Sequence, residues 1–304
     1  MERLEGAKAT HKAVLLSEAV EFLHIQKGDW YIDATAGAGG YSKAILEKGG
    51  RVLALDADRK AVRVTERELR NFCDDQGIYT GYKVVQGNFR DVAAIASREG
   101  LSEVAGVVFD LGISSIQLAE TGRGFSFEDK ESKLDMRLDQ DSQSVSAADL
   151  LYSLRQDQLE VLFAEVMNRA KARRLAREAV AFRESRRIER VRDMVELVER
   201  SGFWKGKLRA PTLAFLALRI AVNSEIESLR VGLEGALEVV RRGGRLVVVS
   251  FHSGEDRVVK GVFGGWDADG RVKVLTKQPV RPCEDEIKNN VRSRSARLRT
   301  VEKI

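Results

Sequence analysis

The sequence predicts an α/β protein with a doubly wound, mostly parallel sheet that is interrupted by a helical insertion. Short apolar runs alternate with helical patterns through the first part of the chain, which is the order that builds parallel strands joined by helices. The strand pattern then stops between residues 119 and 207, where only helical spacing is found, and it resumes towards the end of the chain. One sheet domain with an inserted helical segment therefore accounts for the whole sequence.

Short apolar runs bounded by glycine, acidic or polar residues are typical of buried strands. We expect strands over residues 31–35, 51–56, 82–86, 105–110, 245–251 and 271–275. Charged, amphipathic stretches between the first of these runs predict helices over residues 42–48 and 61–72. The run 105–110 is almost wholly apolar, as a strand covered on both faces should be.

The segment between residues 119 and 207 predicts helices that pack on one another. Two apolar stripes at helical spacing lie in it, made by Leu159, Leu162, Phe163, Val166, Met167 and Ala170 and by Val191, Met194, Val195 and Val198. One long helix is expected over residues 212–240, before the strand 245–251. We therefore expect residues 1–118 and 208–304 to form one domain, and residues 119–207 to form an inserted helical domain.

The composition indicates a globular protein with a mildly basic surface. Hydrophobic residues make up 43% of the 304 residues, which is enough for a buried core. The chain has 51 Lys and Arg residues against 46 Asp and Glu residues, a formal net charge of +5. That excess fits a polyanionic partner, although many basic surfaces are only solvated.

Neither a secreted nor a membrane protein is indicated. The start of the chain lacks the apolar core of a signal peptide, and no window approaches the apolar length of a membrane span. The two cysteines, Cys73 and Cys283, lie far apart, so neither a disulfide framework nor a metal site is expected. A cytoplasmic protein is the expectation that follows.

The strongest chemical signal is a glycine-rich loop between a strand and a helix. Asp33 lies towards the end of the first expected strand, and Gly37, Gly39 and Gly40 follow in the turn. Glycine permits a sharp turn and lets the backbone approach a ligand closely. The second expected strand ends in Asp56, whose carboxylate can accept both ribose hydroxyl hydrogens of a nucleoside. The alternative is that the glycines form only a turn.

The spacing favours S-adenosylmethionine over a dinucleotide. A dinucleotide fingerprint has a third small residue three positions after its second glycine. That position holds Ser42, and Gly40 stands beside Gly39 instead. S-adenosylmethionine carries no pyrophosphate, and acids such as Asp33 and Asp56 suit its cationic methionine part and its ribose.

Several long strings resemble one family of enzymes over nearly the whole chain. They are residues 11–18, 109–118, 123–127, 134–137, 217–225, 250–257 and 292–299, together with the glycine loop. With these strings the chain resembles the bacterial 16S rRNA cytosine-N4 methyltransferase family, also called the MraW family. It departs from the usual family pattern at Tyr41, Ile116, Leu216, Gly254 and Val291. The resemblance implies a Rossmann-like class I methyltransferase fold.

The resemblance also implies a reaction and a set of cofactor contacts. The reaction is methylation, by S-adenosylmethionine, of the exocyclic N4 amine of a decoding-region cytosine in 16S rRNA of the small ribosomal subunit. The residues implied to contact the cofactor are Gly39, Gly40, Tyr41, Asp56, Phe89, Asp110 and Gln117, beside Asp33 and Gly37 from the loop itself. Residues 119–207 would then form the domain that recognises the substrate.

The target amine is a poor nucleophile because its lone pair is delocalised into the ring. The protein therefore has to align the amine and accept its hydrogens. Asp110, at the end of the fourth expected strand, is the main candidate for this role. Ser114 and Ser115 can assist or can cap a turn. His252 can be catalytic or structural, and Phe89 can pack on adenine or belong to the core.

A cytosine has to leave its stack to reach a buried methyl group, so the RNA backbone must be held elsewhere. The arginines expected to bind RNA phosphates are Arg123, Arg137, Arg292, Arg294, Arg297 and Arg299. The last four of them lie within eight residues, in a segment expected to be a tail with little core to bury. The alternative is that this tail packs back on the sheet and its arginines pair with Glu284, Asp285 and Glu286. A run on the insertion, Arg169, Lys171, Arg173, Arg174 and Arg177, is either a further phosphate-binding face or an ordinary solvated one.

Two other functions stay open at this point. The chain can be a diverged methyltransferase that acts on another RNA, a protein or a small molecule, or a relative that binds RNA without catalysis. The presence of Gly39, Gly40, Asp56 and Asp110 argues against the second of these. The sequence does not indicate the oligomeric state.

Overall fold

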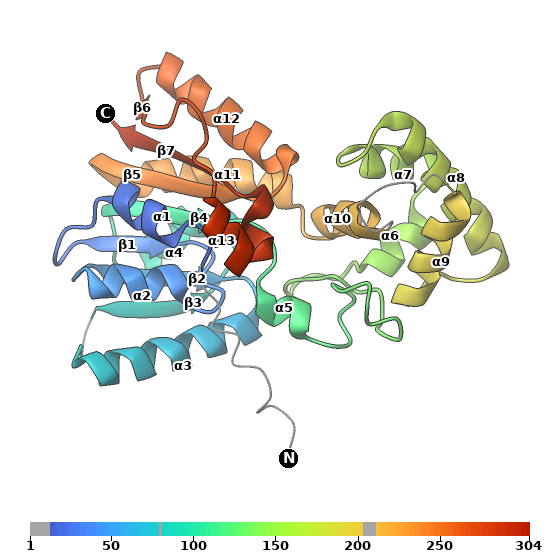
Figure 1. Cartoon of the computed structure of the whole chain (residues 1–304), viewed down its shortest axis with the longest axis horizontal. Coiled ribbons are helices and arrows are strands. Elements are labelled where there is room, and N and C mark those ends of the chain that lie inside the picture. Colours follow the sequence, from blue (N-terminus) through green and yellow to red (C-terminus); the bar gives the residue numbers. More distant parts are fainter. Residues whose placement is uncertain (1–12, 79–80, 203–210) are drawn as a thin grey trace. The chain divides into compact units, whose positions relative to one another are not determined.

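The computed structural model describes residues 13–78, 81–202 and 211–304, and the chain divides into two compact units. The first unit comprises Met1–Ser115 and Leu229–Ile304, and the second comprises Ile116–Ser228. Figure 1 follows the chain through both units, from blue to red. The start of the resemblance string 11–18 and the expected domain boundary at 207/208 lie outside the described residues. Each unit is described by itself.

The first unit contains a seven-stranded sheet in the order β3-β2-β1-β4-β5-β7-β6 (Figure 1). Its strands are β1 (Trp30–Asp33), β2 (Arg51–Asp56), β3 (Tyr82–Gln86), β4 (Val104–Asp110), β5 (Val240–Ser250), β6 (Val272–Val274) and β7 (Arg297–Lys303). Strands β1 to β5 are parallel, whereas β7 is antiparallel to β5 and to β6. The predicted fold class, a doubly wound and mostly parallel sheet of the Rossmann-like kind, is confirmed.

Strand order brings three aspartates to one edge of this sheet. From β1 the chain moves outward to β2 and β3, and then returns to place β4 on the other side of β1. In the register, Asp33 of β1 is paired with Ala54 of β2 and with Val108 of β4. The last residues of β1, β2 and β4 are Asp33, Asp56 and Asp110, so their carboxyl ends meet at the switch point where such sheets bind ligands.

Helices cover the sheet of the first unit. They are α1 (Leu16–Leu23), α2 (Gly40–Glu47), α3 (Arg59–Gln76), α4 (Val92–Arg98), α12 (Ser253–Ala268) and α13 (Glu284–Asn289), with the larger part of α11 (Glu225–Val239) and two short 3-10 turns at Phe89–Asp91 and Val291–Ser295. Side chains from α1, α2 and α3, among them Leu23, Ile45 and Leu69, form one core with the strand residues Tyr31 and Val247. This core holds the strand ends in place.

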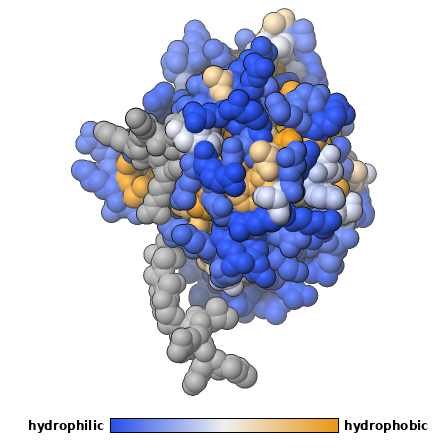
Figure 2. Space-filling view, turned by 90° about the vertical axis from the view of Figure 1, so that its right-hand side faces the viewer, coloured by the Kyte–Doolittle hydropathy of each residue, from blue (hydrophilic) through white to orange (hydrophobic). Residues whose placement is uncertain are grey.

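The second unit is helical. Its helices are α6 (Ala147–Ser153), α7 (Gln156–Ala164), α8 (Arg169–Ser185), α9 (Val191–Ser201) and α10 (Pro211–Val222), after α5 (Ser115–Ala119) at the boundary. Phe163, Phe182 and Met194 are buried in its core. The face of the molecule seen in Figure 2 is mostly hydrophilic, with small scattered hydrophobic areas. No strand is assigned to the described residues of this unit, although Lys133 and Arg190 form an isolated bridge.

The expected long helix over residues 212–240 is wrong, because the chain forms two helices there. Helix α10 ends at Val222 and α11 begins at Glu225, and Ser224 between them has a left-handed φ of 47°. The side chain of Asn223 donates to the carbonyl oxygen of Met136 at 2.8 Å and accepts from the amide of Leu138 at 2.9 Å. These tertiary hydrogen bonds hold the break, and helix propensity alone does not reveal them.

The boundary of the helical unit also differs from the expected one. Helix α10 was expected in the sheet domain, but it lies in the second unit, where it packs on α6, α7 and α9. The expected stripe from Leu159 to Ala170 is likewise divided between two helices. Asn168 caps the second of them, accepting from the amide of Lys171 at 3.0 Å.

The basic segment 292–299 was expected to be a tail with little core to bury, and this is wrong. Its second half begins β7, which pairs with β5 along six residues. Arg299 is only 7% exposed and donates from Nε to Oδ1 of Asp256 at 2.6 Å, while Nη1 of Arg297 donates to Oδ2 at 2.8 Å. Asp256 of α12 neutralises Arg297 and Arg299 where the segment enters the sheet, whereas the carboxylates expected as partners lie in α13.

The structure bears on the cysteines and on the expected absence of a membrane span. Cys73 is buried and Cys283 is exposed, and both are free thiols. Among the described residues, no helix combines the length and the apolar character that crossing a membrane requires. The expected cytoplasmic location stays a prediction.

The ion pairs of Asp256 generate a stability prediction. Burial alone would raise the pKa of Asp256, but the hydrogen bonds and charges of Arg299 and Arg297 lower it below its usual value. Arg299→Ala leaves this carboxylate buried with one partner fewer, so we expect a loss of about 3 kcal/mol in the free energy of unfolding. The measurement is urea denaturation, with Arg294→Ala, at an exposed site, as the matched control. Equal stabilities of the two variants would contradict the buried pair.

Candidate functional site

The carboxyl edge of β1, β2 and β4 carries a cluster of polar groups within the first unit. Asp33, Asp56 and Asp110 come from neighbouring strand ends, and the glycine loop between β1 and α2 runs among them. Burial raises the pKa of Asp33 and of Asp56 to about 6. Their mutual charges add to this effect, because the charge of Asp33 is a further cause of the raised pKa of Asp56.

Asp33 holds the turn that follows β1. Its Oδ2 accepts from the backbone amide of Ser42 at 3.1 Å and from Oγ of Ser42 at 2.7 Å, while Oδ1 accepts from the amide of Thr35 at 3.3 Å. The residue is fully buried. Asp33 therefore fixes the first turn of α2 against the end of β1, and its expected contact with the cofactor stays a prediction.

Asp56 ties the second strand to the glycine loop. Its Oδ2 accepts from the amide of Gly37 at 3.0 Å, and its Oδ1 accepts from the amide of Asp58 at 2.9 Å. Each carboxylate oxygen has two lone pairs, so both keep a free acceptor site for a hydroxyl group. This geometry fits the predicted role of Asp56 as the acceptor for the two ribose hydroxyls.

The loop glycines are needed for distinct physical reasons. Gly37 and Gly39 have φ values of 53° and 80°, in the left-handed region. The carbonyl oxygen of Gly37 also accepts from Oγ1 of Thr65 at 2.8 Å, so the loop is pinned from both sides. At Gly40 a Cβ atom would come within 2.9 Å of the Cβ of Ala13. Gly40 is therefore required by the N-terminal segment that packs on it.

Tyr41 points away from the loop. Its side chain is buried, and its hydroxyl donates to the carbonyl oxygen of Val14. Burial raises the pKa of this hydroxyl well above its usual value. Any contact of Tyr41 with the cofactor would therefore come from its backbone, and the side chain serves to anchor the segment around Val14.

Asp110 is the least satisfied acid of the cluster. Its Oδ1 is buried and has no hydrogen-bond partner among the described residues. Burial raises the pKa of this carboxyl well above its usual value, and the charges of Asp33 and Glu255 raise it further. Its backbone amide donates to Oγ1 of Thr35 at 2.6 Å, which fixes the strand end. A buried acceptor without a donor is costly unless a ligand completes it.

Phe89 lies after β3 and packs within the protein. Its ring meets that of Phe109 edge to face, with centroids 5.7 Å apart. Gly232 of α11 permits this position, because a Cβ atom there would come within 2.8 Å of the Phe89 ring. Phe89 therefore packs in the core, as one of the two expectations had it, and its stacking on adenine stays a prediction.

The loop after β4 returns towards the glycine loop. A Cβ atom placed on Gly37 would lie 3.6 Å from the Cβ of Ser114, so these two loops are in contact range. Gln117 is buried and belongs to the second unit. The expected roles of Ser114, of Ser115 and of Gln117 stay predictions.

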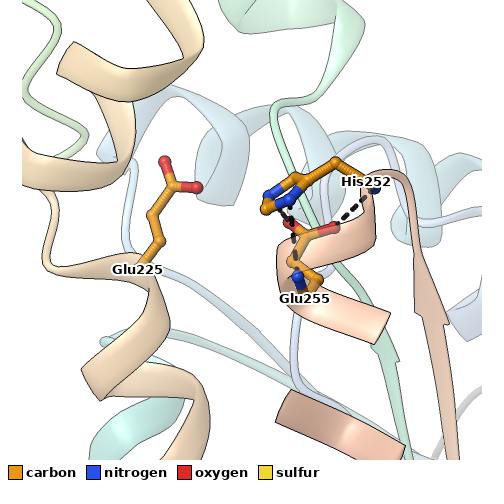
Figure 3. Close-up of side chains that lie close together, drawn as sticks. All are labelled: Glu225, His252 and Glu255. Carbon is orange, nitrogen blue, oxygen red and sulfur yellow. Dashed lines mark hydrogen bonds and ion pairs between the residues drawn. The ribbon is translucent and has the colours of Figure 1, made fainter. Parts of the chain in front are cut away.

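His252 caps α12, as Figure 3 shows together with Glu255. Its Nδ1 accepts from the amides of Gly254 and Glu255 at 3.2 and 3.4 Å, and Oε2 of Glu255 accepts in return from the amide of His252 at 3.2 Å. The neutral ring therefore carries its proton on Nε2. That atom lies 3.1 Å from Oε1 of Glu255, in a geometry that makes no hydrogen bond. The structural role expected for His252 is present, and a catalytic one stays a prediction.

Two of the arginines expected to bind RNA are engaged within the second unit. Arg123 is buried and donates to Oε2 of Glu120 at 2.9 Å and to the carbonyl oxygen of Arg137 at 2.6 Å. Arg137 forms a two-pronged pair with Asp135, at 2.8 Å for each hydrogen bond. These contacts fold the irregular segment around residue 123. Of the other expected arginines, Arg292 and Arg294 are exposed, whereas Arg297 and Arg299 pair with Asp256.

Some residues of the site were missed by sequence reasoning. Thr35 and Thr65 each hold a functional loop or strand end through a side-chain oxygen. Thr35 stands beside residues that had been singled out, so its position was a usable signal. Thr65 lies in the middle of α3, where nothing in the local pattern marks it.

The cluster fits a ligand that carries positive charge and hydroxyl groups. A cation relieves the repulsion among the three carboxylates, and hydroxyls fill the free acceptor sites of Asp56. Oδ1 of Asp110 remains for a further N–H or O–H donor. S-adenosylmethionine has both features in its methionine ammonium, its sulfonium and its ribose.

The role of Asp56 generates a binding prediction. Asp56→Asn removes the charge and replaces one carboxylate oxygen, with its two lone-pair sites, by an amide group that only donates, so S-adenosylmethionine should bind more weakly by about 1.5–3 kcal/mol. Asp58→Asn is the matched control, since Asp58 caps α3 by accepting from the amide of Lys60 and Asn caps equally well. Calorimetric titration of both folded variants is the measurement. Unchanged affinity in Asp56→Asn, or an equal loss in the control, would reject the assignment.

Comparisons with known proteins agree with this chemistry. A model of the MraW methylase family matches residues 8–304. The chain is 43% identical to the ribosomal RNA small subunit methyltransferase H of Thermomicrobium roseum over 97% of this chain and 94% of that protein, and 38% identical to the protein of the same name from Pelobacter propionicus over 97% and 98%. Among solved structures, an rRNA methylase from Streptococcus thermophilus matches with a TM-score of 0.45 and 12% identity, covering 95% of this chain and 93% of that one. The predicted cofactor, S-adenosylmethionine, is confirmed, and the chain belongs to the MraW methylase family.

Proposed function

We propose that this protein methylates the exocyclic N4 amine of a decoding-region cytidine in 16S rRNA, cytosine 1402, with S-adenosylmethionine as the methyl donor. Methylation of small-subunit ribosomal RNA is supported by relatives named ribosomal RNA small subunit methyltransferase H, at 38–43% identity over nearly the whole chain. The choice of atom and nucleotide rests on the resemblance and on the chemistry of Asp110.

The single observation that carries the proposal is the unpartnered oxygen of Asp110. An amino group is a donor, so it completes a buried acceptor, whereas a carbonyl group at the same place would leave two acceptors facing each other. Cytosine presents an amine where uracil presents a carbonyl. Asp110 Oδ1 therefore favours an amino-bearing base.

The residues of the site then have separate tasks in the reaction. Bound S-adenosylmethionine supplies an electrophilic methyl group on a positively charged sulfur. Asp110 accepts a hydrogen bond from the amine, which localises the nitrogen lone pair, and its raised pKa suits it to take the proton that the nitrogen loses on methylation. Asp56 and the pinned glycine loop orient the cofactor. Ser114 is placed to assist by its position beside Gly37.

His252 has a smaller part in this scheme. The backbone amides at the start of α12 occupy Nδ1, so this nitrogen is not available to accept a hydrogen bond from a ligand. What it can offer is the N–H at Nε2, as a donor to a carbonyl or ring nitrogen. Its first task is to fix Glu255 and the end of β5.

The RNA has to be held while one base is extruded. We assign substrate recognition to the helical insertion, expected over residues 119–207, and phosphate contacts to the exposed Arg292 and Arg294. Arg297 and Arg299 are less suited, because Asp256 already neutralises them. A cytoplasmic location follows from the proposed substrate, the small ribosomal subunit.

Asp110 generates the test of this function. Asp110→Asn keeps the shape but places an amide donor or a weaker acceptor at the amine, so turnover should fall by about a hundredfold or more. The measurement is single-turnover methylation of small ribosomal subunits at saturating S-adenosylmethionine, with mass spectrometry locating the methyl group. Ser114→Ala serves as the comparison and should lose much less.

Three outcomes separate the open alternatives. Near-normal single-turnover rates in Asp110→Asn would show that this carboxylate is dispensable. A methyl group found on another nucleotide, on a protein or on a small molecule would indicate a diverged methyltransferase. Binding of RNA without any transfer by the unmodified protein would indicate a relative that has lost the reaction.

A further inference from the structure

Three arginines form a stripe along one face of α8, in the second unit. Arg169, Arg173 and Arg177 are spaced four residues apart, so each lies about 6 Å further along the helix axis and about 40° further around it. All three are exposed. We call Arg169, Arg173 and Arg177 the arginine stripe.

The arginine stripe has no carboxylate to neutralise it. Within α8 the neighbours three and four residues away from its members are only alanine, valine or further arginine. None of the three forms an ion pair or a hydrogen bond with a carboxylate anywhere in the described chain. Their guanidinium groups are therefore directed to solvent with their charge uncompensated.

Other exposed arginines of the same unit behave differently. Arg192 contacts Glu131 at 2.8 Å, Arg190 contacts the same carboxylate at 4.0 Å, and Arg186 contacts Asp193 at 3.3 Å. Acidic partners are thus available in this unit and are placed beside most of its exposed arginines. The stripe is an exception within its own surroundings.

The stripe is unfavourable for the helix that carries it. Like charges four residues apart repel each other on a helix surface. Arg169 and Lys171 also stand in the first turn, which has no acidic residue, so they oppose the positive end of the helix dipole. A face that only had to be soluble could use alternating charges at lower cost, so the stripe is better explained by an external anion.

We propose that the arginine stripe binds successive phosphates of the RNA that this protein methylates. The inference rests on the proposed RNA substrate and adds a defined contact surface to it. Guanidinium groups bind phosphate oxygens with two parallel hydrogen bonds. Their spacing along α8 is similar to that of neighbouring phosphates along one strand, so the helix can lie along the RNA backbone.

A protein partner fits this face less well. Protein interfaces are anchored by buried aromatic and other large apolar side chains. Among the described residues, the exposed large hydrophobic side chains are Val145, Tyr152, Val161, Val231, Val291 and Ile304, and none of them lies on α8. The face offers charge without an apolar anchor, which is the character of a backbone-binding nucleic-acid surface.

The test compares two triple variants with the same change in net charge. The first is R169Q/R173Q/R177Q, which removes the stripe, and the control is R186Q/R190Q/R192Q, which removes paired arginines. Binding to small ribosomal subunits is measured at several salt concentrations, together with S-adenosylmethionine affinity and melting temperature. A cooperative melting transition establishes that the helical unit is folded in both variants, and the cofactor affinity establishes that the first unit is intact.

The stripe variant should bind the subunit roughly ten- to hundredfold more weakly, and the dependence of affinity on salt should flatten by about two units in log–log slope. Its cofactor affinity should not change, and its melting temperature should stay the same or rise, because repulsion within α8 is relieved. The control should lose thermal stability and should keep a salt slope closer to that of the unmodified protein.

Two results would overturn the inference while leaving the proposed function intact. Subunit binding by the stripe variant that equals that of the unmodified protein would make the stripe a solvated face. Equal losses in both variants would show that only net charge matters. Failure of the unmodified protein to bind or methylate the small subunit would instead remove the proposed function itself.

Discussion

Burial of three neighbouring carboxylates at one edge of the sheet is the constraint on which the rest of the structure depends. Asp33, Asp56 and Asp110 end three adjacent strands, and burial raises the pKa of each. A raised pKa means that the carboxyl group contributes stability below its ordinary pKa and that this stability is lost as the pH rises through about 6 for Asp33 and Asp56. At neutral pH the ionised carboxylates of the site therefore repel one another. The amides of Gly37, Ser42 and Asp58 and the hydroxyl of Ser42 reduce this repulsion by donating hydrogen bonds to Asp33 and Asp56.

The sheet and its chemistry could be read from the sequence because both are local. Asp33 and Asp56 follow apolar runs directly, and the glycines between them mark the turn. The features that the sequence did not predict depend on contacts between residues far apart in the chain. The break at Ser224 involves hydrogen bonds from Asn223 to residues 87 and 85 positions earlier, and the strand at Arg297–Lys303 carries an arginine that pairs with Asp256 of α12. Tyr41 and Gly40 belonged to the predicted loop, yet both face the segment around Ala13.

Arginines in this protein fall into two physical groups, and the sequence does not separate them. Arg123, Arg137 and Arg299 hold loops and strands through buried or partly buried hydrogen bonds. Arg169, Arg173 and Arg177 stay exposed without carboxylate partners in the described chain. A basic run in the sequence therefore indicates an anion-binding surface only when the structure shows that its arginines have no carboxylate partners.

Proton release on cofactor binding tests most directly whether the carboxylate cluster is held ready for a cation. Titrating S-adenosylmethionine into the protein at pH 6, in two buffers of different ionisation enthalpy, measures the protons exchanged. Asp33 and Asp56, with pKa values of about 6, are partly protonated before binding, and a positive ligand lowers those pKa values. We therefore expect net release of protons, with affinity rising between pH 5 and pH 7. The same binding enthalpy in both buffers would mean that no proton is exchanged and would contradict the account.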